Sequence, residues 1–188
     1  MKRDTLSFSG IRQARIDCLG ISQLYISCKK LRNVLSWFDP RDLSGFAPLP
    51  VHDFGNGRLT LTDGHTRAVA AGMAGLSEIP IVYDMDDIIT AEMGQKQYKE
   101  DIVWCDRFHL RSPVDLKERI VSPEDYRELW NDRCDLSYNL LSRSTEEQRA
   151  VWSHAHEGLF LYGADETLTR LYFEDETGKS YTFPRPAE

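Results

Sequence analysis

Leucine and threonine alternate along residues 59–62, a period of two that is typical of a half-buried strand. Asp63-Gly64 ends this alternation, and apolar residues then recur near helical spacing at Val69, Met73 and Leu76. Gly75 stands where the end of a helix favours positive φ, and an apolar run over residues 79–83 follows it. The pattern therefore predicts a strand, a sharp turn, a helix and a second strand.

Similar patterns predict the rest of the chain. Strands are expected over residues 11–19, 51–54 and 102–105, and helices over residues 27–37, 88–98, 112–121 and 122–134. Beyond residue 143, a helix that starts at Thr145 and strands over residues 158–162, 168–173 and 181–183 form a separate layer. The sequence thus predicts an α+β (mixed α/β) fold with a domain over residues 10–135 and a small C-terminal α/β appendage over residues 143–188.

The turn at residues 63–67 carries the chemistry. It places Gly64, His65 and Thr66 at a helix N-terminus, where N–H groups lack intrahelical acceptors and the macrodipole is positive. Gly64 lets a ligand approach closely, Thr66 adds a hydroxyl, and the Arg67 guanidinium can hold phosphate through two hydrogen bonds. These features favour phosphate binding. The alternative is a plain turn in which Asp63 caps the helix and His65 and Arg67 are solvated.

The Asp-Gly-His-Thr-Arg run at 63–67, followed by an alanine-rich helix and Gly-Leu-Ser-Glu-Ile-Pro at 75–80, resembles the core motif of the ParB/sulfiredoxin-like superfamily. Residues 21–27, with the Lys-Leu pair at 30–31, resemble the start of that domain. The closest branch contains free-serine kinases. The resemblance implies a nucleotide-dependent phosphotransferase acting on a small hydroxyl-bearing molecule such as free serine, with ADP or ATP as the phosphate donor.

In this hypothesis Asp63 is the catalytic residue and a Mg²⁺ ligand, and Gly64, His65, Thr66 and Arg67 bind the nucleotide phosphates. The kinase-like branch is expected to carry a glutamate as general base near the start of the helix at residue 28. This chain has Cys28 there. The alternative function is a non-catalytic, ParB-like nucleotide-binding regulator. A sulfiredoxin-type reductase is disfavoured because its cysteine would lie within the phosphate motif.

Two charged clusters leave alternatives open. Lys29, Lys30 and Arg32 lie near a helix N-terminus, where each cation opposes the macrodipole by about 0.3–1 kcal/mol. A bound anion would relieve this repulsion, whereas the alternative is a solvated helix face. The acidic residues at 84–87 either bind Mg²⁺ or cap the following helix.

Composition and net charge argue against some classes of binding partner. The 188-residue chain is 41% hydrophobic, which supports a real core, and its net charge of −7 argues against broad nucleic-acid binding. The predicted helices at 112–134 are too acidic for a DNA-binding face. The chain shows no signal-peptide pattern, no membrane-length apolar stretch and no CxxC pair among its four cysteines. We therefore expect a cytoplasmic protein with reduced thiols, no membrane partner, and a nucleotide and a small molecule as ligands.

Overall fold

The computed structural model describes residues 7–152 and 158–185. Helices and strands are mixed and include a mixed sheet, so the expected α+β class is confirmed. The chain divides into two compact units, Met1–Tyr126 and Arg127–Glu188. Residues 127–135, which the sequence assigned to the first domain, therefore belong to the second unit.

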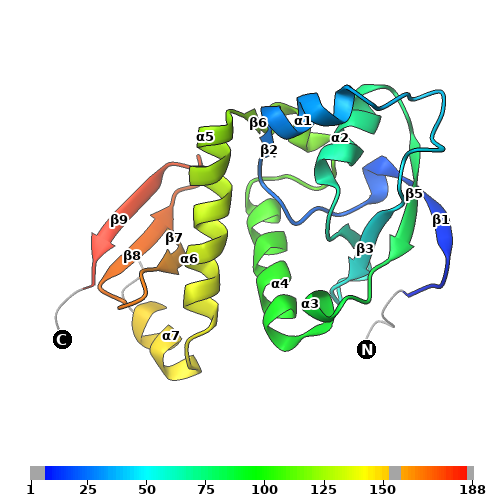
Figure 1. Ribbon diagram of the computed structural model, residues 1–188. Helices are drawn as coiled ribbons and strands as arrows, with labels where there is room; N and C mark the ends of the chain where they lie inside the picture. Colours follow the sequence, from blue (N-terminus) through cyan, green and yellow to red (C-terminus); the bar gives the residue numbers. More distant parts are fainter. Residues whose placement is uncertain (1–6, 153–157, 186–188) are drawn as a thin grey trace. The chain divides into compact units, whose positions relative to one another are not determined.

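The first unit is built on a sheet of four strands in the order β1-β5-β3-β4 (Figure 1). These strands are β1 (Ile11–Arg15), β5 (Glu78–Tyr83), β3 (Leu49–Asp53) and β4 (Leu59–Leu61). β5 pairs antiparallel with β1 and parallel with β3, and β3 pairs antiparallel with β4. Gly55 and Gly57 have positive φ in the predicted hairpin turn between β3 and β4, which only glycine adopts at little cost.

The helices of the first unit are α1 (Cys28–Leu35), α2 (His65–Met73), α3 (Asp87–Thr90), α4 (Glu92–Arg107) and α5 (Pro123–Tyr126), with short 3₁₀ turns η1 (Ile16–Cys18) and η2 (Asp115–Arg119). α1 and α2 lie side by side (Figure 1). Ala68 and Ala71 of α2 pack with buried sheet residues, which are Leu49, Val51, Leu61, Ile79 and Ile81. Because alanine side chains are short, the α2 backbone lies close to the sheet.

The predicted end of α2 is confirmed. Gly75 has φ +84°, the Leu76 N–H donates to the Ala71 carbonyl, and the Gly75 N–H donates to the Gly72 carbonyl. These two bonds make a Schellman motif, which satisfies carbonyls that the helix leaves open.

The predicted strand over residues 102–105 is wrong, because these residues belong to α4. Asp101, Trp104 and Cys105 are buried, and their spacing is that of one helix face, whereas Val103 is 41% exposed. α4 also packs toward the sheet through Tyr98, whose ring stacks on Phe54 at 5.0 Å. Helical packing therefore overrides the strand propensity of this β-branched and aromatic run.

The predicted helix over residues 112–121 is also wrong. This segment holds η2 and then β6 (Ile120–Val121), which pairs parallel with β2 (Ile26–Ser27). The Asp115 carboxylate accepts the backbone N–H groups of Arg111 and Ser112 at 2.8 Å each, which fixes a turn there. The next helix starts as predicted, because the Ser122 hydroxyl accepts the Asp125 N–H at 3.0 Å.

The second unit begins with a π-helical turn η3 (Arg127–Asn131) and continues with α6 (Asp132–Leu141) and α7 (Thr145–Trp152). The helix predicted over residues 122–134 therefore extends to Leu141. An antiparallel sheet of β7 (Phe160–Ala164), β8 (Arg170–Glu174) and β9 (Ser180–Pro184) follows. Its core joins Leu140 of α6 to Leu171 and Phe173 of β8.

Candidate functional site

The N-terminus of α2 is open in the way that an anion site requires. Gly64 is the N-cap residue, with left-handed φ of 78° and ψ of 16°, and no side chain caps the helix. The first helical bond runs from the Ala68 N–H to the Gly64 carbonyl. The N–H groups of His65, Thr66 and Arg67 therefore have no intrahelical acceptor. The alternative in which Asp63 caps this helix is not observed.

Position 64 favours glycine. An added Cβ would lie 2.7 Å from Cδ2 of Leu49 and 2.9 Å from Nη2 of Arg67, and the positive φ would strain any other residue. Leu49 is fully buried in β3, so it has little room to move. The close approach of β3, Gly64 and the Arg67 guanidinium thus depends on a missing side chain.

The open terminus faces a cleft between α1 and α2, with a cavity volume of about 310 Å³. All five residues of the predicted site line it. The other lining residues come from the segment before α1, from α1 and the turn after it, and from α5: Gln23, Lys30, Asn33, Val34, Trp37 and Tyr126. The structure therefore brings the predicted phosphate motif together with side chains that are distant in the sequence.

Arg67 is positioned before any ligand arrives. Its Nη1 donates to the Ala47 carbonyl at 2.9 Å, and its Nη2 lies 3.6 Å from Oδ2 of Asp63. The Arg67 side chain is 20% exposed and that of Asp63 is 81% exposed. The guanidinium is thus held by one backbone bond, whereas the ion pair with the solvated Asp63 carboxylate is weak.

His65 has a structural role that the sequence did not predict. Its ring is buried, and its Nε2 accepts the Ser22 backbone N–H at 3.1 Å. The neutral ring therefore carries its proton on Nδ1. Burial lowers the pKa of His65 to about 4, an effect that nearby Asp63 partly opposes. At pH 7 the imidazole is uncharged, so His65 serves an anion only through its backbone N–H.

The basic side chains at the start of α1 lie in different environments: one lines the cleft and another lies on the exposed face of the helix. Lys30 lines the cleft, where its Nζ lies 4.6 Å from the ring centroid of Tyr126 and donates to the Tyr126 hydroxyl at 3.3 Å. Arg32 instead donates to the Cys28 carbonyl at 3.4 Å on the exposed side of the helix. The unfavourable position of cations at a helix N-terminus was the sequence signal for Lys30. No such signal existed for Tyr126 or Trp37.

The acidic segment at 84–87 forms caps and turns. Oδ1 of Asp86 accepts the Ile88 N–H at 2.9 Å, so Asp86 caps α3 as the capping alternative predicted. Oδ2 of Asp84 accepts the Thr62 hydroxyl at 2.5 Å. Within the residues that the structure describes, no group of three potential metal ligands occurs. The Asp84 and Asp86 carboxylates are therefore occupied by the turn and by the start of α3.

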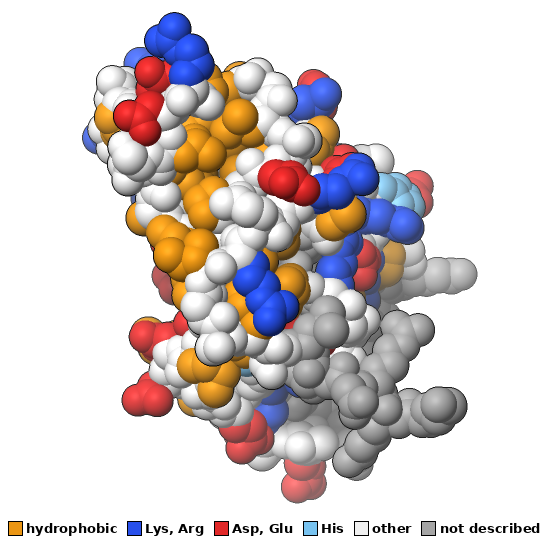
Figure 2. All heavy atoms as spheres, turned by 90° about the vertical axis from the view of Figure 1, so that its right-hand side faces the viewer, with side chains coloured by type: hydrophobic (Ala, Val, Ile, Leu, Met, Phe, Trp, Pro, Cys, Tyr) orange, Lys and Arg blue, Asp and Glu red, His pale blue; other side chains and the backbone are white. Residues whose placement is uncertain are grey.

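Charges are mixed on the face of the molecule drawn in Figure 2. Lysine, arginine, aspartate and glutamate side chains all occur there, and hydrophobic side chains lie among them. No helix in the described part of the chain is long and apolar enough to cross a membrane.

Among known proteins, the chain matches neither a protein-family model nor a curated protein.

Proposed function

We propose that this cleft binds the phosphate groups of a nucleotide and that the protein transfers a phosphoryl group to a small hydroxyl-bearing molecule such as free serine, with ADP or ATP as the donor. The observation that carries the proposal is the uncapped α2 terminus in a cleft that also holds Lys30 and Arg67. Helix N-terminal N–H groups and the macrodipole both stabilise bound phosphate. The resemblance at residues 63–67 points to the same ligand.

Different lining residues would contact different parts of the nucleotide. The N–H groups of His65 and Thr66 and the Thr66 hydroxyl would donate to phosphate oxygens. Arg67 would turn its Nη2 from Asp63 toward the phosphate, while Ala47 keeps its other nitrogen in place. Trp37 is 47% exposed at the cleft and offers a flat face for a nucleobase, because bases stack on aromatic rings.

The donor set fits a Mg²⁺ ion shared with the nucleotide. Mg²⁺ commonly binds one or two carboxylates together with phosphate oxygens and water, and Asp63 presents a solvated carboxylate at the cleft. Asp63 would hold the ion, and the bound ion would neutralise negative charge on the phosphates.

In the transfer itself, the acceptor hydroxyl oxygen attacks the terminal phosphorus as the bond to the nucleotide oxygen breaks. Asp63 would accept the hydroxyl proton, and the backbone N–H groups would stabilise the charge on the transferred group. The shortened nucleotide is the leaving group.

A second candidate function is a nucleotide-binding regulator without chemistry. Cys28, where the resemblance implies a glutamate, is half-buried at the start of α1, and it does not line the cleft. Asp63 is exposed, and its described ion pair is the weak one with Arg67. A general base is usually held in a defined geometry, so these two observations favour binding alone.

Binding is tested by calorimetry on the full chain with ADP, ATP and CTP, each with and without Mg²⁺. Replacing Arg67 by alanine should weaken nucleotide binding by about 1.5–3 kcal/mol, or roughly 10- to 150-fold. Arg41→Ala is a matched control, because Arg41 is exposed, pairs with Asp39 and lies outside the cleft. Binding of no nucleotide, or equal affinity in wild type and Arg67→Ala, would contradict the phosphate site.

Chemistry is tested separately by mass spectrometry of phosphoserine formed from serine with ADP or ATP. Product formation supports the phosphotransferase. Nucleotide binding without product from serine or other small hydroxyl-bearing acceptors would instead support the regulator.

A further inference from the structure

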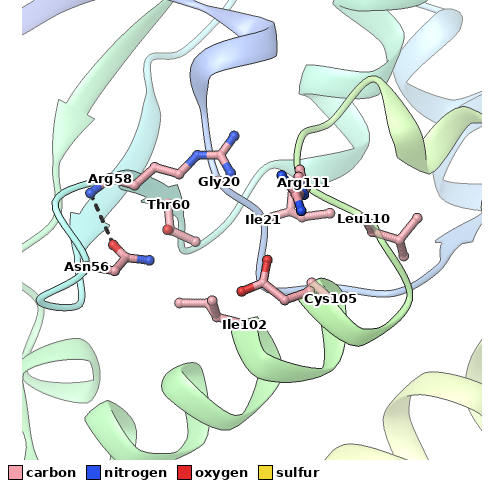
Figure 3. Close-up of a pocket in the computed structure, with 10 residues that line it drawn as sticks. Gly20, Ile21, Asn56, Arg58, Thr60, Ile102, Cys105, Leu110 and Arg111 are labelled. Atoms are coloured by element: carbon pink, nitrogen blue, oxygen red, sulfur yellow. Dashed lines mark hydrogen bonds between the residues drawn. The ribbon is translucent and has the colours of Figure 1, made fainter. Parts of the chain in front are cut away.

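The first unit contains a second pocket, separate in its lining residues from the cleft at α2. Its cavity volume is about 200 Å³, and Figure 3 shows its walls. Ile102, Cys105 and Asp106 of α4 line it, as do Leu110 and Arg111 beyond that helix. The remaining lining residues are Gly20, Ile21, Asn56, Arg58 and Thr60.

Arg58 is fixed in this pocket by the backbone. Its Nε donates to the Cys18 carbonyl at 3.2 Å and its Nη2 donates to the Leu19 carbonyl at 3.0 Å. A guanidinium has five N–H donors, so these bonds leave three of them for a ligand. Because the Arg58 side chain is already ordered, binding an anion costs less side-chain entropy.

Arg111 adds a second cation. Its backbone N–H is bound by Asp115, but its guanidinium makes no hydrogen bond or ion pair that we find in the described residues. Figure 3 shows Arg58 and Arg111 in the upper part of the pocket, with Ile102 below them. In this view Ile21 and Leu110 lie beside Arg111, so the arginine donors and two apolar side chains share the upper part of the pocket.

The pocket also carries an opposite charge and an apolar wall. Asp106 is an exposed carboxylate on α4, and it forms no ion pair with Arg58 or Arg111. Ile21 and Leu110 are buried hydrophobic residues, and both line the pocket with Ile102. Two cations, one anion and a hydrophobic wall therefore surround one small volume.

We propose that this pocket binds a free α-amino acid with an aliphatic side chain. Its carboxylate would be held by Arg58 and Arg111, because guanidinium groups match the two oxygens of a carboxylate. Its ammonium would be held by Asp106, and its side chain would lie against Ile102 and Leu110. The cavity volume of about 200 Å³ leaves room for a small molecule of this kind.

This site does not depend on the proposed function, since it shares no lining residue with the cleft. An isolated carboxylate or amine would satisfy one half of the charged wall and leave the other half unmatched. The class of ligand therefore follows from the combination of both charges with the apolar residues.

The test is calorimetric titration of the full chain with L-leucine and L-valine, with sodium acetate and isobutylamine as half-molecule probes. We expect one amino acid bound per chain and at least tenfold weaker binding of either half. Arg111→Gln and Asp106→Asn should each weaken L-leucine binding at least tenfold. Both side chains lie at exposed positions, so these variants should fold, which circular dichroism checks.

Arg41→Gln is the matched control, because it removes an exposed guanidinium away from the pocket. Its L-leucine affinity should equal that of wild type. The proposal is overturned if neither amino acid binds at millimolar concentration, if acetate binds as tightly as L-leucine, or if the two pocket variants bind as tightly as the control.

Discussion

Replacing Gly64 by alanine tests how the turn at residues 63–67 is built. The left-handed conformation costs a non-glycine residue about 1–2 kcal/mol. The new Cβ would also lie 2.7 Å from the buried Leu49 side chain and 2.9 Å from the Arg67 guanidinium. Overpacking of this kind costs about 1–3 kcal/mol, so the free energy of unfolding should fall by roughly 2–5 kcal/mol.

Gly75→Ala separates the two contributions. Gly75 also has positive φ, at +84°, but a Cβ there would meet no atom within 4 Å. This variant should therefore lose only the conformational cost of about 1–2 kcal/mol. Urea unfolding followed by circular dichroism gives the free energy for both variants and wild type. If Gly64→Ala is no less stable than Gly75→Ala, the contact of Gly64 with Leu49 and Arg67 does not constrain the turn.

Three further outcomes are expected. Asp63→Asn should reduce phosphoserine formation about 100-fold, the scale of a general base, and Cys28→Glu should raise it, both measured by mass spectrometry; undiminished product would remove Asp63 from the mechanism. Burial lowers the pKa of His65 from its ordinary 6.5 to about 4. The neutral His65 ring therefore contributes fully to the stability of the fold above pH 6.5, and this contribution is lost as the pH falls toward 4. Wild type should thus lose about 3 kcal/mol more than His65→Gln between pH 7.5 and pH 4 in urea titrations; parallel losses would contradict the buried neutral ring. In the second unit, Glu174→Gln should cost up to about 3–5 kcal/mol in unfolding free energy, because Glu174 and Arg133 form a buried ion pair at 3.7 Å; an unchanged urea midpoint would refute this.

Local features of the fold followed from the sequence because a few neighbouring residues decide them. The break at Asp63-Gly64, the positive φ of Gly75 and the cap by Ser122 each depend on backbone sterics or on hydrogen bonds within three residues. The position of residues 64–67 at the start of α2 was predictable for the same reason. Their shared place at a helix N-terminus needs no long-range information.

Short apolar segments were not predictable in this way. Residues 102–105 have strand-forming side chains, yet they lie in α4 because the residues around them continue a buried helical face. Residues 120–121 form a strand because β2 pairs with them, although nearly a hundred positions separate the two strands in the chain. Propensity favours one structure weakly, and the packing partner then decides.

The sequence by itself determined that the strand alternation breaks at Asp63-Gly64 and that a helix follows, but not whether the Asp63 side chain caps that helix. Only the tertiary structure decided what each side chain there does. Ser22, far upstream, takes the His65 ring into the interior, while Ala47 orients Arg67 and Tyr126 contacts Lys30. These roles depend on contacts between residues that chain folding alone brings together, so no local pattern in the sequence could specify them.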